Sequence, residues 1–127
     1  MEFRFQKFWQ LIGISLVAFI ITVSLMHKPP IDLPPFRFAD KMGHFMAYFI
    51  VMGWYVQMFH APVQRLFLMA VFVVMGVGLE VLQGLGGVRV FEWADALANS
   101  LGALAAFALG KTGFQYYLSR VEKHFFP

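Results

Sequence analysis

The 127-residue sequence contains no cysteine and is poor in charged residues. The absence of cysteine excludes disulfide scaffolds, thiolate zinc sites and cysteine nucleophiles. Charged residues make up 13% of the chain and hydrophobic residues 60%, whereas ordinary soluble domains contain roughly 25% and roughly 45–50%. A chain of this length could not bury so much apolar surface as a soluble globule, and a disordered chain needs low hydrophobicity. The composition therefore predicts an integral membrane protein.

The net charge is +3 and the isoelectric point is near 9.5, values that some nucleic-acid-binding proteins share. Here the basic residues stand between apolar segments, so we interpret them as topology signals and contacts to lipid headgroups. The sequence predicts no nucleic-acid partner.

Four apolar segments are candidates for crossing the bilayer, which takes roughly 20 residues of helix. They are residues 8–26, 43–59, 66–85 and 93–110, and residues 111–127 follow as a tail. Basic residues precede the first segment, as in a signal peptide. However, the segment is long and no small-residue cleavage site follows it, so we expect a retained helix. Pro29, Pro30, Pro34 and Pro35 mark the next stretch as a loop.

The tail has the pattern of a helix that lies in the membrane interface. On a helix its apolar side chains share one face, namely Phe114, Tyr117, Leu118, Val121 and Phe125. The alternative is a partly ordered tail. The predicted fold is thus an all-α, four-helix transmembrane bundle with a short C-terminal interfacial helix, in a single domain over residues 1–127.

Lysine and arginine are more numerous on one side of this predicted bundle than on the other. The positive-inside rule therefore predicts that both termini lie in the cytoplasm. The cytoplasmic set is Arg4, Lys7, Arg65, Lys111, Arg120 and Lys123, and the outer set is Lys28, Arg37, Lys41 and Arg89.

Polar residues gather at three helix ends that antiparallel crossings would bring to one side of the membrane. The opposite ends carry nothing comparable, so the sequence predicts one polar pocket that opens outward. Its residues are Asp40, Lys41 and His44, then Glu80 and Gln83, then Arg89, Asp95 and Asn99. Two of the pairs, Asp40 with His44 and Asp95 with Asn99, are four residues apart and so share a helix face.

An ionisable residue within a membrane span usually faces protein or water and has a partner. For Glu80 we expect Arg89 or His44. Glu80 or Asp95 would act as a base with His44 as its acid–base partner, and basic side chains would hold a phosphate or carboxylate. The predicted catalytic residues are Glu80, Asp95 and His44, and the predicted substrate-binding residues are Asp40, Lys41, Gln83, Arg89 and Asn99.

Structural interpretations of the same residues stay open. Glu80 and Arg89 could form an ion pair that locks the bundle, and Asp95 could cap the fourth helix. A proton or ion path is another alternative, although polar residues are absent from the inner half of the spans. No recognised ligand spacing supports a metal site, so the sequence predicts neither a metal nor a cofactor.

Small residues recur at every fourth position of the last apolar segment, which predicts close packing against another helix. They are Ala94, Ala98, Gly102, Ala106 and Gly110, with Gly76 and Gly78 as candidate counterparts.

The residues at the three polar helix ends resemble the VanZ-like family of small bacterial membrane proteins. The shared pattern is Asp40-Lys41-x-x-His44-Phe45, Glu80-x-x-Gln83, Arg89, and Asp95-x-x-x-Asn99 with Gly102. The resemblance implies a four-helix fold in the bacterial inner membrane and a role at the cell envelope. The family's name-giving member is associated with resistance to the glycopeptide antibiotic teicoplanin, but the resemblance implies no known reaction.

Two functions follow from the pocket and the resemblance. The first is binding or processing of an anionic envelope lipid or lipid-linked cell-wall precursor, linked to the response to glycopeptide antibiotics. The second is a non-enzymatic structural or interaction protein whose polar cluster only specifies helix packing. The sequence leaves open whether the protein is an enzyme and whether it forms a homo-oligomer.

Overall fold

The computed structural model describes residues 3–26, 39–87 and 92–126. Over these residues the chain is helical and contains no strand, which confirms the all-α prediction. The elements are α1 (Gln6–Ser24), α2 (Ala39–Met58), α3 (Pro62–Leu85), α4 (Trp93–Leu109), the 3-10 helix η1 (Gly113–Tyr116) and α5 (Tyr117–Phe125).

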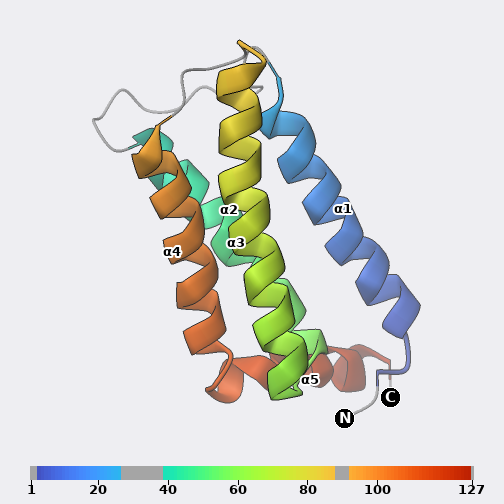
Figure 1. The fold of residues 1–127 in the computed structure, drawn as a ribbon. Helices are drawn as coiled ribbons and strands as arrows, with labels where there is room; N and C mark the ends of the chain where they lie inside the picture. Colours follow the sequence, from blue (N-terminus) through green and yellow to red (C-terminus); the bar gives the residue numbers. More distant parts are fainter. Residues whose placement is uncertain (1–2, 27–38, 88–91, 127) are drawn as a thin grey trace.

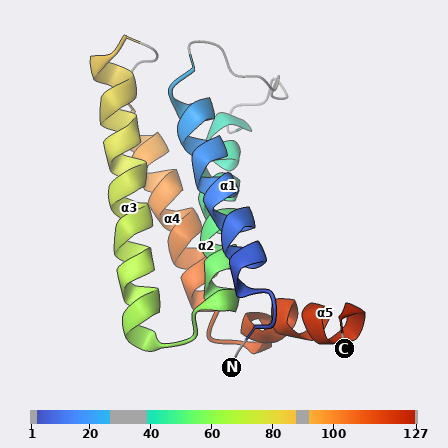
Figure 2. The same cartoon turned by 90° about the vertical axis from the view of Figure 1, so that its right-hand side faces the viewer.

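Helices α1 to α4 lie side by side and alternate in direction, and α5 lies across one end of them (Figures 1 and 2). Both termini lie at this same end, which we call the α5 end (Figure 1). Helix α2 is the central element, because it contacts α1, α3, α4, η1 and α5. The starts of α2 and α4 and the end of α3 therefore share the opposite end of the molecule.

Helices α2 and α3 each begin four residues earlier than the sequence predicted, and in each case the first turn has a physical reason to be helical. Helix α3 starts at Pro62, since the fixed backbone angle of proline suits the first position of a helix. Helix α2 starts at Ala39, so its first turn includes Asp40, whose charge favours the helix N-terminus. The end of α3 agrees with the prediction, and Gly87 follows with a φ of 68°.

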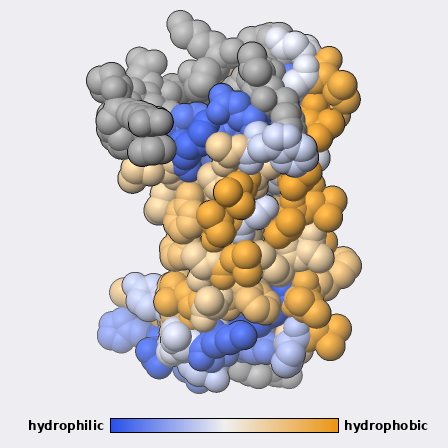
Figure 3. Space-filling model, turned by 60° about the vertical axis from the view of Figure 1, so that its left-hand side comes forward, coloured by the Kyte–Doolittle hydropathy of each residue, from blue (hydrophilic) through white to orange (hydrophobic). Residues whose placement is uncertain are grey.

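The middle of the molecule is apolar both inside and out. Val51, Met52 and Val56 of α2 are fully buried against Phe72 of α3 and Ala103 of α4. On the outer surface a broad apolar belt separates hydrophilic residues at the two ends (Figure 3). By length and composition, α1 and α3 are apolar enough to cross a membrane, and α4 is a shorter apolar helix.

The small residues of α4 let α2 approach it closely, as their spacing predicted. A Cβ on Gly102 would lie 2.1 Å from the main-chain oxygen of Phe45, and one on Gly110 would lie 2.9 Å from Cβ of Val56. Gly102 and Gly110 face α2, which the sequence did not name as the partner, whereas of the two expected counterparts on α3 only Gly76 lies close to α4. Gly78 of α3 meets nothing within 4 Å, and Gly76 meets the side chain of Asn99.

The α5 end carries polar groups of its own, so the prediction that it has nothing comparable is wrong. Arg65 is buried and donates hydrogen bonds to the main-chain oxygens of Val56 (2.9 Å), Phe59 (2.9 Å) and Gly110 (2.8 Å), and to Oε1 of Gln115 (3.0 Å). These carbonyls belong to the C-terminal ends of α2 and α4, where a cation is favourable.

The tail is helical from Tyr117 to Phe125, but its apolar face is not buried as a whole. Leu118 packs into the bundle, whereas Tyr117 and Phe125 are exposed. The buried positions beside Leu118 are polar, namely Ser119 and Glu122. The face turned to the bundle therefore carries specific polar contacts, which the apolar pattern alone could not reveal.

Glu122 joins the tail to the start of the chain. Its Oε1 accepts a hydrogen bond from the main-chain N–H of Arg4 (2.6 Å), and its Oε2 accepts bonds from the N–H of Phe5 (3.2 Å) and from Nε1 of Trp9. Burial acts to raise the pKa of this carboxyl, but the donors outweigh it and hold the pKa below its ordinary value. The ionised carboxylate thus lies at the N-terminus of α1.

Candidate functional site

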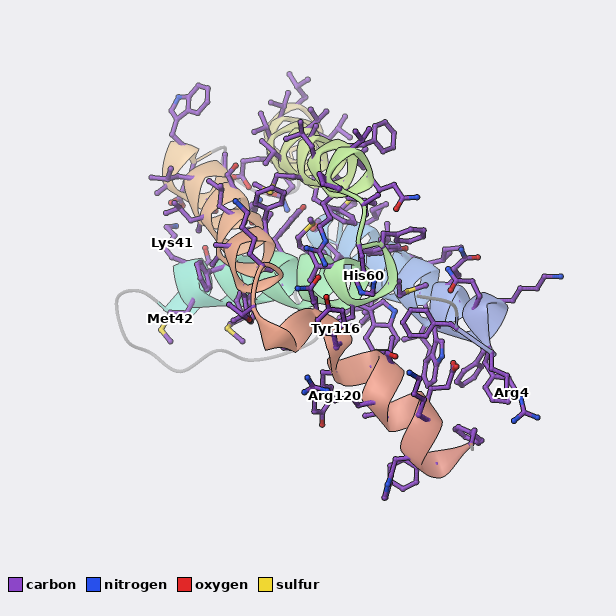
Figure 4. All side chains as sticks on the ribbon, turned by 90° about the horizontal axis from the view of Figure 1, so that it is seen from below. Arg4, Lys41, Met42, His60, Tyr116 and Arg120 are labelled. Atoms are coloured by element: carbon purple, nitrogen blue, oxygen red, sulfur yellow. The ribbon has the colours of Figure 1, made fainter. Side chains whose placement is uncertain are left out.

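The predicted polar residues of α2 and α4 meet at the end of the molecule opposite α5. Lys41 of α2 lies among three carboxylates, with Nζ 2.5 Å from Oδ1 of Asp95, 2.6 Å from Oε2 of Glu92 and 3.4 Å from Oδ2 of Asp40. Figure 4, seen from the α5 end, places Lys41 on α2 beside α4, while Met42 points away from the bundle. This lysine therefore ties the first turn of α2 to the first turn of α4.

His44 and Asn99 form the next layer, about one helical turn deeper. Nδ1 of His44 lies 2.9 Å from Oδ1 of Asn99, and Nδ2 of Asn99 donates to the main-chain oxygen of Gly76 at 3.2 Å. A carbonyl oxygen only accepts, so the contact with Gly76 fixes which end of the Asn99 amide is nitrogen. The amide oxygen consequently faces His44, and Nδ1 of the ring must carry a proton.

The other ring nitrogen of His44 faces two carboxylates. Nε2 lies 3.6 Å from Oδ2 of Asp95 and 3.7 Å from Oδ1 of Asp40. The predicted sharing of one helix face by Asp40 and His44 is confirmed by this contact. With Nδ1 protonated, a neutral ring presents a lone pair at Nε2. Three electron-pair donors then converge on one small space.

Glu80 is almost fully buried, with 1% of its surface exposed. Its Oε1 accepts a hydrogen bond from the main-chain N–H of Glu92 at 3.0 Å, and it interacts electrostatically with Asp95 and His44. Glu92 is the N-cap residue immediately before α4, so Glu80 places a carboxylate at the N-terminus of that helix. Glu80 thereby links α3 to the cluster through the main chain of α4.

Two other predicted residues are not seen in this cluster. Nε2 of Gln83 donates to the main-chain oxygen of Ser24 at 2.5 Å, so this side chain connects α3 to the end of α1. Arg89, the expected partner of Glu80, lies outside the described residues. The structure therefore brings together Asp40, Lys41, His44, Asp95 and Asn99, with Glu80 attached through Glu92.

Two residues of this region were missed by sequence reasoning. Glu92 pairs with Lys41, and its position three residues before Asp95 at the start of α4 could have identified it. Tyr48 stands one turn after His44, is 2% exposed, and its hydroxyl has no hydrogen-bond partner among the described residues. The ring of Tyr48 lies against Gly76, next to Asn99.

Acidic groups outnumber basic ones in the described part of this site. The described residues contribute one ammonium group to the site, that of Lys41, which pairs with three carboxylates, Asp40, Glu92 and Asp95. Glu80 adds a fourth carboxyl group through the main chain of Glu92. Asp95 is buried, whereas half of the Asp40 side chain is exposed, so solvent reaches the cluster from the Asp40 side. A cluster of this kind can bind a cation, or exchange protons through His44 and the carboxylates beside it.

A family model described as VanZ/LLP1 matches residues 2–114 of the chain. The match covers all four long helices and every residue of the cluster, and it confirms the resemblance found in the sequence. No curated protein and no solved structure matches the chain.

Proposed function

Because the chain belongs to the VanZ/LLP1 family, we propose that it is a multi-pass protein of the bacterial inner membrane whose polar cluster binds the headgroup of an anionic envelope lipid or lipid-linked cell-wall precursor. The family match, together with the two helices of this chain that are apolar enough to cross a membrane, indicates a membrane protein. The observation that carries the proposal is the position of the cluster. Buried ionisable side chains gather at one end of a bundle whose middle is apolar on the surface (Figure 3).

The proposed topology has four crossings with both termini in the cytoplasm. The four long helices alternate in direction and lie side by side, so they can cross together (Figure 1). At 1.5 Å per residue, α4 spans only about 26 Å, slightly less than a hydrocarbon core of about 30 Å. The start of α4 with Asp95 would then lie near the level of the lipid headgroups, where the outer leaflet presents phosphate groups.

Within this site we assign headgroup binding to Lys41 and Arg89, and positioning to Asp40 and Asn99. The ammonium group of Lys41 is partly exposed, with 26% of its side chain accessible, so a phosphate can reach it by replacing one of its carboxylate partners. For any processing reaction the geometry favours His44 with Asp95 over Glu80. Glu80 is enclosed and already accepts the N–H of Glu92.

The test is to measure which lipids copurify with the full chain. We would extract the protein in mild detergent, identify the bound lipids by mass spectrometry, and compare Lys41→Ala and Asp95→Asn with a control, Lys111→Ala, at the α5 end. We expect one anionic lipid class to be enriched over the bulk membrane in the wild type and the control, and lost in the two site variants. The same lipid profile in all four proteins would contradict the proposal.

A purely structural role for the cluster is the second candidate, and it rests on a specific observation. Several polar groups of the cluster bond another part of the protein, as Lys41 does to Asp95 and Asn99 to Gly76. The variants Glu80→Gln and Asp95→Asn separate the two functions. Variants that fold normally but lose the lipid support headgroup binding, whereas variants that only unfold support the structural role.

A proton or ion path is disfavoured by the core. Between the cluster and the α5 end, the described part of the chain places Val51, Met52 and Val56, which are apolar and fully buried. A liposome flux assay that detects no proton leak would exclude this alternative.

A further inference from the structure

We propose that Asp40, His44 and Asp95 form a binding site for a divalent transition-metal ion such as Zn²⁺ or Mn²⁺. The three ligand atoms are Oδ1 of Asp40, Nε2 of His44 and Oδ2 of Asp95, and all lie within 4.8 Å of one another. The sequence predicted no metal, because no recognised ligand spacing supports a metal site. The structure brings Asp40, His44 and Asp95 together from the starts of two different helices.

The contact with Asn99 orients the His44 ring for metal binding. Since Asn99 accepts from Nδ1, the lone pair of the neutral ring is at Nε2, on the side of the two carboxylates. Metal-binding histidines usually have this arrangement, in which the distal N–H donates to an oxygen that fixes the ring. Asn99 therefore performs for His44 the orienting role that a metal site requires.

Among the described residues, Lys41 is the only lysine or arginine that pairs with these two carboxylates. Asp95 is more than nine-tenths buried, and its Oδ2 faces Nε2 of His44 at 3.6 Å. Lys41 approaches the other oxygen of each carboxylate, Oδ1 of Asp95 and Oδ2 of Asp40. Oδ2 of Asp95, Oδ1 of Asp40 and Nε2 of His44 thus face one another, an arrangement that a metal ion bound among them would stabilise.

The separation of the ligand atoms also suits a shared ion. Two atoms that bind one ion at about 2.1 Å in tetrahedral geometry lie about 3.4 Å apart. The two carboxylate oxygens lie 3.6 and 3.7 Å from Nε2, within a few tenths of an ångström of that spacing, and all three atoms lie within 4.8 Å of one another. Asp40 is the exposed residue of the three, in the first turn of α2.

The ligand set indicates the class of ion. One imidazole and two carboxylates, without thiolate, suit Zn²⁺, Mn²⁺ or Fe²⁺ better than Ca²⁺ or a soft ion such as Cu⁺. The exposed side of Asp40 leaves a position open to solvent, where a phosphate oxygen could bind the ion. This inference rests on the proposed function only for the phosphate oxygen. The ion itself binds to protein side chains.

The test measures metal binding without lipid, so its outcome is independent of the lipid experiment. Tag-free full chain, stripped with a chelator and held in lipid-free detergent, would be titrated with Zn²⁺ and with Mn²⁺ by calorimetry. We expect one ion per chain, at least a 100-fold loss of affinity in His44→Ala and Asp40→Asn, and roughly a 10-fold loss in Asn99→Ala, the range typical of residues that orient a ligand.

The matched control is His60→Ala. His60 lies at the α5 end, where its Nε2 contacts the main-chain oxygen of Gln115 (3.0 Å) and its ring packs against Tyr116 (Figure 4). This variant should bind metal as the wild type does. Asp40 is exposed at a helix start, so Asp40→Asn keeps the test informative even where His44→Ala unfolds. A wild type that binds neither ion, or that binds no tighter than Asp40→Asn, overturns the inference.

Discussion

Replacing Gly102 with alanine tests whether close contact between α2 and α4 holds both the fold and the site together. The new Cβ would lie 2.1 Å from the main-chain oxygen of Phe45, whereas ordinary contact starts at 3.4 Å. The two helices would have to separate locally by about 1.3 Å, the difference between these distances. The obstacle is backbone, so no side-chain rotation can relieve it.

The expected change in the free energy of unfolding follows from three effects, two destabilising and one stabilising. Overpacking of this kind costs typically 1–3 kcal/mol, and more where backbone must move. Alanine is preferred over glycine in a helix by about 1 kcal/mol. Separation of the helices also weakens the bond between His44 and Asn99, which is worth about 1 kcal/mol. We therefore expect Gly102→Ala to lower the free energy of unfolding by about 1–3 kcal/mol.

Gly78→Ala is the matched control, because a Cβ there meets nothing within 4 Å. This substitution should leave stability unchanged or raise it by up to about 1 kcal/mol. Both variants would be unfolded in mixed micelles by titration with a denaturing detergent, followed by tryptophan fluorescence. Equal stability of Gly102→Ala and Gly78→Ala would refute the reasoning, since the two changes differ only in what the new methyl group meets.

Three further substitutions test other buried polar groups, with the same unfolding assay. Arg65→Gln should lower the free energy of unfolding by about 3 kcal/mol, because it removes charge-assisted hydrogen bonds to the ends of α2 and α4. A variant as stable as the wild type would show that these carbonyls find other donors. The pKa of Glu122 is held low in the folded protein, so its contribution to stability is present above the ordinary value of 4.5 and is lost as the pH falls through the lowered pKa. Glu122→Gln should therefore be about 2 kcal/mol less stable at neutral pH and should flatten this acid dependence, and an unchanged pH profile would contradict the assignment. Tyr48→Phe should be neutral or stabilising by about 1 kcal/mol, because it removes a buried hydroxyl that has no partner among the described residues; a marked loss of stability would mean that this hydroxyl is bonded.

Much of the arrangement followed from the sequence because it depends on direction and length alone. Apolar segments of helical length, joined by short connections, must alternate in direction. Polar residues at the starts of α2 and α4 therefore had to meet at one end, and the structure brings Asp40, Lys41, His44, Asp95 and Asn99 together there.

The specific partners could not be predicted, because they depend on how each helix is rotated and how closely it packs. Gln83 contacts Ser24 because of the orientation of α3 relative to α1. His44 reaches Asn99 because Gly102 lets α2 and α4 approach each other. Arg65 bonds to main-chain carbonyls, and a sequence gives no sign of which carbonyls lie at a helix end.

The Glu122 contact has a consequence for the order of events during synthesis. The N–H groups of Arg4 and Phe5 are synthesised 118 and 117 residues before their acceptor, Glu122. That acceptor belongs to α5, which follows the four long helices in the chain. These N–H groups must therefore find other partners until α5 has been made, and a nascent chain arrested before α5 would hold α1 without this contact.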